Sequence, residues 1–243
     1  MPINTLKGNK TTRVLEDAEK SGYGVIAAIV YNIEHIIGCI KAAEQKRSPL
    51  IIQVFPWVIT FSNGLLVHTA AEAASRVSVP ISVHSDYAQD EAMIRYAAGI
   101  LPFDSTMVGM SHYEKAENLA KIKKLAKYCY DRGIATKVEP GRIGDLEGML
   151  TTPKEAGEFM DTGIHGEHGP RGPQLDYLRL ESTRKFAAGK VWIVFYGTND
   201  FSEEAMKVNV NKLLSLTPLM EEGVEVVKLM GWRMDVCYLV GKA

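Results

Sequence analysis

Residues 25–55 of the chain are VIAAIVYNIEHIIGCIKAAEQKRSPLIIQVF, and this stretch decides the fold class. Val25–Val30 is a continuous apolar run, which is typical of a strand buried on both faces of a sheet, and Leu50–Phe55 reads as a second buried strand. Between them, Ile33–Lys46 carries apolar side chains at helical spacing on one face. A strand, a helix and a second strand of these lengths predict a βαβ unit with two parallel strands.

The same alternation continues through the 243 residues, which contain no stretch with the composition of a linker. We therefore expect one domain, residues 1–243, and a TIM (β/α)8-type α/β barrel rather than an open sheet, because the units repeat seven or eight times. Only Thr162–Ile164 is left for a sixth strand, and Ser202–Lys207 is short for a seventh helix. We expect the barrel to be incomplete around strand 6 and helix 7. The other predicted strands are Pro80–His84, Ser105–Met110, Ile134–Val138, Val191–Phe195 and Val208–Val210, and the other predicted helices are Thr11–Ser21, Asn63–Ser75, Asp90–Ala98, Glu114–Arg132, Pro153–Met160, Leu175–Phe186 and Leu219–Val236.

Composition and charge exclude several classes of protein. Apolar residues make up 46% of the chain, which excludes disorder, and the net charge of -1 gives no field for nucleic acid or an anionic membrane. The most apolar stretch, residues 50–61, is too short to span a membrane, and the N-terminus lacks the pattern of a signal peptide. Cys39, Cys129 and Cys237 form no CxxC pair, so we expect reduced, buried thiols and a cytoplasmic location.

Polar and charged residues collect where the predicted strands end, which is the side of a TIM barrel that carries chemistry. Asp86 follows the third strand and is a candidate general acid or base; the alternative is a loop carboxylate that caps a helix. His165 and His168 lie three residues apart in a glycine-rich loop and could both reach a metal, although such a pair alone is a weak signal. Gly197–Asn199 and Asn211-Lys212 suit a phosphate cradle, or they are ordinary turns.

Matching stretches over nearly the whole chain resemble the class II, metal-dependent fructose-bisphosphate (ketose-bisphosphate) aldolases. The resemblance implies a zinc ion that polarises the ketone, and it implies that Asp86 moves the proton of the aldehyde-side hydroxyl. The stretches are Gly22–Val25 with Tyr31-Asn32, Ala42–Glu44 with Ser48–Gln53, Val79–Asp86, Phe103–Ser105 through Ser111-His112, Glu139 with Gly141–Ile143, His165-Gly166 with Gly169-Pro170, Leu175-Asp176, Gly197-Thr198, Val208–Asn211 and Gly241–Ala243.

The resemblance also assigns metal and phosphate positions. Of the three metal histidines of the family, only His165 is retained, and Tyr87 and Tyr196 stand at the other two positions. Glu139 matches a metal-site glutamate of the family. Two further polar residues of the family fall at Gly109 and Ile29 and are lost. The positions expected to bind substrate or its phosphate are Gly166, Gly197, Thr198, Asn199, Asn209 and Asn211.

These departures set the expected chemistry. A phenol with a pKa near ~10 is a poor zinc ligand at neutral pH, so we expect Tyr87 and Tyr196 to lower zinc affinity sharply. Skipped exons could account for the places where family members run longer, but not for these two tyrosines. The resemblance implies an aldehyde lyase of carbohydrate metabolism that cleaves a ketose (bis)phosphate with weakened or altered activity. The alternative is a catalytically inactive barrel that binds a sugar phosphate or acts as a scaffold.

The resemblance also suggests an assembly. It implies a homodimer formed through the C-terminal helices, whereas Leu219–Val236 could equally pack on its own barrel.

Overall fold

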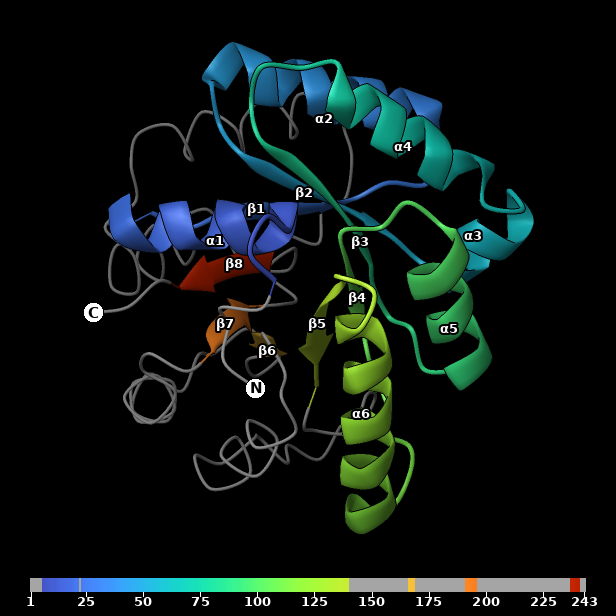
Figure 1. The fold of residues 1–243 in the computed structure, drawn as a ribbon. Helices are drawn as coiled ribbons and strands as arrows, with labels where there is room; N and C mark the ends of the chain where they lie inside the picture. Colours follow the sequence, from blue (N-terminus) through green and yellow to red (C-terminus); the bar gives the residue numbers. More distant parts are fainter. Residues whose placement is uncertain (1–5, 22, 140–165, 169–190, 196–236, 241–243) are drawn as a thin grey trace, which may run out of the picture.

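The structure is a computed structural model that describes residues 6–21, 23–139, 166–168, 191–195 and 237–240 (Figure 1). Eight described strands pair in chain order around a closed barrel. Each strand hydrogen-bonds to the next, and the eighth returns to the first. The strands are β1 (Ile26–Ile29), β2 (Leu50–Val54), β3 (Ile81–Ser85), β4 (Ser105–Met107), β5 (Ala135–Val138), β6 (Gly166–His168), β7 (Trp192–Phe195) and β8 (Cys237–Val240).

The predicted TIM-type barrel is confirmed, with local differences. β1 to β7 are parallel, whereas β8 runs antiparallel to both β7 and β1. β6 has three residues, so strand 6 is as short as expected, although it lies at Gly166–His168 rather than at Thr162–Ile164. The predicted strand Val208–Val210 and the region of helix 7 lie outside the described residues, and Cys237–Val240 takes the eighth place.

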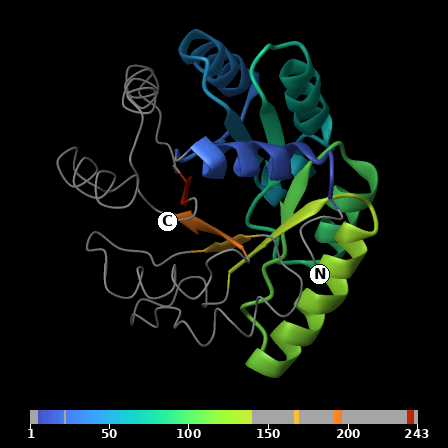
Figure 2. The same cartoon turned by 60° about the vertical axis from the view of Figure 1, so that its left-hand side comes forward.

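Helices cover the outside of the barrel in two groups (Figures 1 and 2). α2 and α4 lie side by side over β2 and β3, and α5 and α6 pack together against β4 and β5. Each group buries an apolar layer between helix and sheet, with Ile36, Ile52 and Val83 in the first and Ile94 and Val138 in the second. The described helices are α1 (Lys10–Ser21), α2 (Ile33–Lys46), α3 (Pro56–Phe61), α4 (Leu65–Ser75), α5 (Glu91–Ile100) and α6 (Lys115–Tyr130).

Short polar caps fix where the helices begin. The Asn32 side chain accepts a hydrogen bond from the backbone N–H of His35, and Asp90 does the same for Met93 at the start of α5. α3 was not predicted, because six residues are too few to show helical periodicity. Its start at Pro56 fits the preference of proline for the first helical turn.

α1 closes the N-terminal end of the barrel (Figure 2). Its Thr11 hydroxyl lies in hydrogen-bond contact with Ser82 at the start of β3 and donates to Ser105 at the start of β4. Its apolar face packs with residues of β1, β2 and β7 in a buried cluster inside the barrel. Chemistry is therefore confined to the opposite, C-terminal end of the strands, which is where TIM barrels carry their sites. The cluster contains Val14, Leu15, Ala18, Val25, Ala27, Ile51 and Trp192.

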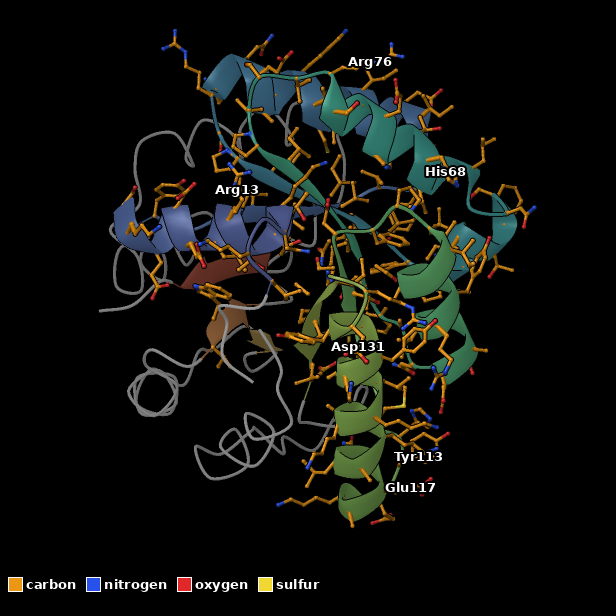
Figure 3. All side chains as sticks on the ribbon, viewed as in Figure 1. Arg13, His68, Arg76, Tyr113, Glu117 and Asp131 are labelled. Carbon is orange, nitrogen blue, oxygen red and sulfur yellow. The ribbon has the colours of Figure 1, made fainter. Side chains whose placement is uncertain are left out.

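The surface of α6 carries the lysine-rich stretch of the chain, and two carboxylate residues near its two ends, Glu117 and Asp131, are labelled in Figure 3. Lys121 lies 3.4 Å from Glu117, and Lys127 lies 2.7 Å from Asp131, each pair at i,i+4 spacing. The lysines are thus interleaved with carboxylates on a solvated face. Among the described helices, none is long and apolar enough to cross a membrane.

Candidate active site

Four polar side chains meet inside the barrel because strand residues alternate between its two faces. In β2 and β3, the neighbours Val54 and Val83 belong to the outer apolar layer, so the intervening positions face inward. Val138 of β5 likewise packs outward. The inward side chains that result are Gln53, His84, Asp86 and Lys137.

Asp86 lies at the centre of this group and is fully buried, at 0% exposure. Its backbone N–H continues the β3 ladder by donating to the carbonyl of Val54 at 3.1 Å. Gln53 Nε2 donates to Asp86 Oδ2 at 2.9 Å, and the Lys137 ammonium donates to Oδ1. Asp86 therefore does not cap a helix; Asp90 caps α5 instead. The candidate acid or base is thus held by one amide and one cation.

Lys137 and Asp86 form a buried ion pair, with side-chain exposures of 7% and 0%. The opposite charge stabilises the ionised carboxylate, and each ion offsets part of the desolvation cost of the other. Glu139, which the resemblance places at the metal site, follows β5 and is also buried. The described interior thus holds a buried ion pair, and a second buried acidic residue follows the strand that carries its lysine.

His84 extends the polar group toward α1. Its Nδ1 lies 2.8 Å from Ser105 Oγ, and Ser105 in turn accepts from Thr11. Its Nε2 lies 3.6 Å from Asp86 Oδ1. Burial lowers the pKa of His84 and the Lys137 charge lowers it further, while Asp86 opposes both, so the ring is neutral at neutral pH. A polar column therefore runs through the barrel interior from α1 to Asp86.

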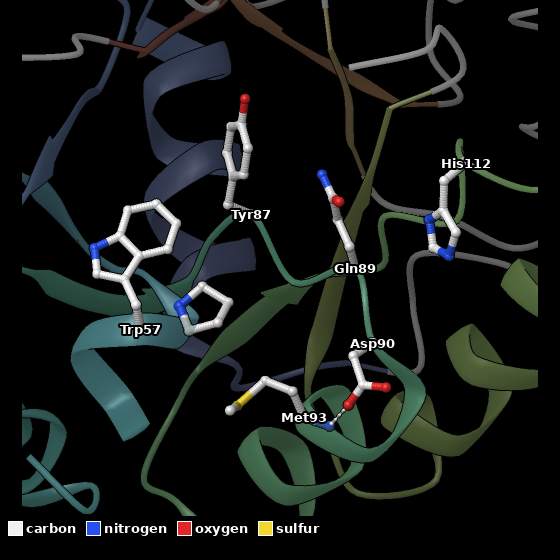
Figure 4. Close-up of a pocket in the computed structure, with 7 residues that line it drawn as sticks. Trp57, Tyr87, Gln89, Asp90, Met93 and His112 are labelled. Atoms are coloured by element: carbon white, nitrogen blue, oxygen red, sulfur yellow. Dashed lines mark hydrogen bonds between the residues drawn. The ribbon is translucent and has the colours of Figure 1, made fainter. Parts of the chain in front are cut away.

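The Tyr87 side chain is not part of this polar column and packs in an aromatic cluster with Phe55 and Trp57. Its φ of 61° lies in the left-handed region, which is uncommon for a residue with a bulky side chain. Its ring centroid lies 5.5 Å from Phe55 and 6.4 Å from Trp57. It also lines a cavity of about 500 Å³ at the mouth of the barrel, with Trp57, Gln89, Asp90, Met93, His112 and Pro56 (Figure 4).

The described residues do not fit a zinc site. Among them, no three His, Cys, Asp or Glu side chains converge to hold a metal ion. Both oxygens of Asp86 are engaged, one by an ammonium that would repel a divalent cation, and the Tyr87 ring packs against other rings. A Cβ at Gly109 would lie 2.9 Å from the carbonyl oxygen of Ala88, so the lost family carboxylate has no space there. Ile29, at the position of the other lost polar residue, is a buried apolar side chain that pairs with Gln53 in the register of β1 and β2.

Most of the other expected site residues lie outside the described part of the chain. Gly166 is in β6, opposite Lys137 in the strand register. It therefore lies on the strand next to the buried ion pair. The residues outside the described ranges are His165, Tyr196, Gly197, Thr198, Asn199, Asn209 and Asn211, and the side chain of His168 also lies outside them.

The structure describes the side chains of two of the three cysteines, Cys39 and Cys129. Cys39 and Cys129 are buried free thiols, as expected, and burial raises their pKa to about 11 and about 12. Both pack in the apolar layers under the outer helices. They are therefore structural and take no part in the site, and the side chain of Cys237 lies outside the described part.

Sequence reasoning missed Gln53, His84 and Lys137 as site residues. A signal was present: each is a polar residue inside an otherwise apolar or small-residue strand, at a position that alternation turns inward. The alternation could not predict that Lys137 pairs with Asp86, because the two residues are 51 positions apart in the chain.

Comparison with known proteins shows the family of the chain. The family model for class II fructose-bisphosphate aldolase matches residues 9–216. A Coccidioides immitis protein provisionally named fructose-bisphosphate aldolase is 42% identical over 251 residues, which cover 88% of this chain and 83% of that protein. A Giardia intestinalis fructose-bisphosphate aldolase is 32% identical over 173 residues, covering 68% of this chain and 52% of that one. The chain belongs to the class II fructose-bisphosphate aldolase family, whose members are generally metal-dependent.

Solved structures agree on the fold. A crystal structure of the provisionally named aldolase from Coccidioides immitis superposes with a TM-score of 0.77 at 37% identity, over 93% of this chain and 92% of that one. The YdjI aldolase from Escherichia coli K12 gives 0.72 at 23% identity, over 90% and 92% of the two chains. The second likeness supports the barrel alone.

Proposed function

We propose that the chain catalyses the reversible aldol cleavage of a ketose phosphate, with Asp86 as the group that moves the proton of the aldehyde-side hydroxyl. One observation carries the proposal: a buried carboxylate at the C-terminal end of β3, held by Gln53 and Lys137 inside the barrel. Ionised Asp86 takes the hydroxyl proton, the adjacent C–C bond breaks, and its electron pair moves toward the ketone to give an enediolate. The other half of the substrate leaves as an aldehyde.

The surroundings of Asp86 set a condition on this step. The carboxylate has no exposed surface, and Gln53 and Lys137 each engage one of its oxygens. A substrate hydroxyl must therefore use a remaining lone pair of the carboxylate or displace one of these two partners. Gln53 is the easier partner to displace, because it is uncharged and its loss leaves the ion pair intact.

We infer that the activity is weak. Tyr87 and Tyr196 stand where the family resemblance places two of the three zinc histidines, and the Tyr87 ring packs beside Phe55 and Trp57. General acid–base catalysis alone supplies roughly 10²–10⁴-fold. The engaged, buried state of Asp86 favours one second candidate, a barrel that binds a sugar phosphate without cleaving it.

Cleavage of fructose 1-phosphate by the purified chain, followed as dihydroxyacetone phosphate formed, tests the proposal together with the metal content by elemental analysis. Asp86→Asn is expected to lower the rate by about 10²–10⁴-fold with little change in KM. Asp131→Asn, on the exposed end of α6, is the matched control and keeps the rate. A rate unchanged in Asp86→Asn contradicts the proposal. Binding of the sugar phosphate without turnover would support the second candidate.

We also infer a single domain, a cytoplasmic location and a homodimer. The continuous barrel supports the first of these and the buried thiols of Cys39 and Cys129 support the second. The dimer rests on family resemblance alone. Sedimentation of the purified chain would test it.

A further inference from the structure

The cavity at the barrel mouth is lined by residues that follow the same strand end as the candidate base. Pro56 and Trp57 follow the end of β2, and Tyr87 and Gln89 follow the end of β3. Asp86 is the chain neighbour of Tyr87, so the cavity and the carboxylate rise from the same strand end. The cavity volume of about 500 Å³ lies within the range of small-molecule pockets, so the cavity has room for the aldehyde half of a substrate.

One wall of this cavity is aromatic and supported from behind. The rings of Trp57 and Tyr87 lie 6.4 Å apart at 70°, and Phe55 packs against both, at 4.4 Å and 5.5 Å between centroids. Trp57 is 53% exposed, which is high for so large an apolar side chain. Met93 adds apolar surface on the side of α5 (Figure 4). The wall thus presents a rigid apolar surface to an incoming group.

The polar part of the cavity does not suit a phosphate. Asp90 contributes a carboxylate, which the N-cap of α5 fixes through a 2.8 Å hydrogen bond from the Met93 N–H. The described lining residues include neither Lys nor Arg. A phosphate here would face a negative charge and apolar rings, both of which disfavour a dianion. Gln89 and His112 offer hydrogen bonds to neutral hydroxyl or carbonyl groups.

We propose that this cavity binds the aldehyde half of the substrate, and that this half is uncharged and has an apolar face. The inference rests on the proposed function, which places Asp86 at the aldehyde-side hydroxyl. The substrate class that follows is a ketose monophosphate, with its phosphate on the ketone half. An aldehyde bearing an alkyl or aromatic group fits the wall of Trp57, Tyr87 and Met93.

Binding is tested with unreactive alcohols, so that the result does not depend on turnover. Isothermal titration of the full-length chain with 3-phenylpropan-1-ol is expected to give saturable binding, which Trp57→Ala weakens about ten-fold by removing one aromatic wall. Phe61→Ala is the matched control, because Phe61 lies on the same helix, is 95% exposed and does not line the cavity. Equal loss in both variants, or no loss in Trp57→Ala, overturns the proposal.

The charge preference is tested by competition. Glycerol 3-phosphate is expected to displace 3-phenylpropan-1-ol poorly from the wild-type chain. Asp90→Asn keeps an N-cap residue but removes the charge, and should make the phosphate about two- to five-fold more effective. Efficient displacement by glycerol 3-phosphate from the wild type overturns the inference that the aldehyde half is uncharged.

The two proposals fail separately. If the binding pattern holds but no aldol product forms from dihydroxyacetone phosphate and 3-phenylpropanal, the aldolase proposal fails and the cavity assignment stands. If aldol activity depends on Asp86 but Trp57→Ala does not alter the preference between 3-phenylpropanal and glyceraldehyde 3-phosphate, the cavity assignment fails alone.

Discussion

Lys137 changes the chemistry of the barrel interior more than any other residue. It brings a cation to a buried carboxylate that the resemblance assigns to proton transfer. A buried pair of this kind adds little net stability, yet removing one partner is costly because the other is left charged and unpaired. The pair therefore fixes the position and ionisation of Asp86 rather than adding stability to the fold.

Lys137→Met is expected to lower the free energy of unfolding by about 3–5 kcal/mol, measured by urea denaturation, because it leaves the Asp86 carboxylate buried without its cation. Combining it with Asp86→Asn should recover part of the loss, since no charge then remains to be desolvated. Lys127→Met, which breaks the exposed pair with Asp131, is the control and should cost about 0.2–1 kcal/mol. Strictly additive losses in the double variant would contradict this account.

Gly109 shows why the lost family carboxylate cannot simply be restored. Its N–H donates to the Ala88 carbonyl at 2.8 Å, and a Cβ would meet that same oxygen at 2.9 Å and Met107 Cε at 3.1 Å. Gly109→Asp is expected to lower the free energy of unfolding by about 1–3 kcal/mol through overpacking. Ala116→Asp, on the exposed first turn of α6, controls for the added charge. A Gly109→Asp chain as stable as the wild type in urea would show that the backbone yields.

At the scale of elements, the long helices could be predicted from sequence because their periodicity is local. α2 begins and ends where the apolar spacing indicated, at Ile33 and Lys46. Three elements could not be predicted: the six-residue α3, the displaced β6 and the antiparallel β8. Short segments carry too little periodicity, and their conformation depends on neighbouring strands that are distant in sequence.

Part of the candidate site could likewise be predicted from the sequence, and part could not. Asp86 could be predicted because a charged residue at the end of an apolar strand stands out in the sequence. Its partners Gln53 and Lys137 could not, since inward alternation does not say which strands face each other across a barrel. The place of Tyr87 in the aromatic cluster depends on its positive φ, and a positive φ cannot be predicted from the sequence for a tyrosine.

The hydrogen bonds that anchor the start of α1 lead to a prediction at the scale of elements. Just before the helix, Asn9 Nδ2 donates to the carbonyls of Asp104 at 2.6 Å and Gly133 at 2.8 Å, while its Oδ1 accepts from the Thr12 N–H. Asn9→Ala is expected to lower the free energy of unfolding by about 1–2 kcal/mol. Amide hydrogen exchange should speed up mainly in α1. The exposed Lys7→Ala is the control, and equal exchange in the two variants would contradict an anchoring role.

The whole molecule has a stability that depends on pH through Asp104, which precedes β4. Burial raises the pKa of Asp104 above its usual 3.8, and the hydrogen bond from the Val83 N–H and the charge of Lys10 only partly oppose this. As the pH rises past 3.8, the unfolded chain loses this proton first, so the carboxyl group stabilises the fold less and less until the raised pKa is passed.

Asp104→Asn removes this titration and keeps an acceptor for the Val83 N–H. The wild-type free energy of unfolding, minus that of the variant, should therefore fall as the pH increases from about 3.8. Urea denaturation of both chains at a series of pH values provides the measurement. A difference that stays flat, or that grows with pH, would show that the buried carboxyl group is better solvated than its position suggests.

α1, which closes the N-terminal end of the barrel, makes a contact that can form only late in the synthesis of the chain. Glu19 of α1 accepts a hydrogen bond from the Trp192 indole, 173 residues further on. At about 5–20 residues per second, a ribosome needs roughly 10–35 seconds to deliver that indole after it has released the glutamate. Throughout this interval Val14 and Leu15 can pack only on the early members of their cluster, Val25, Ala27 and Ile51, so the contact of α1 with β7 is the last part of this cluster to form.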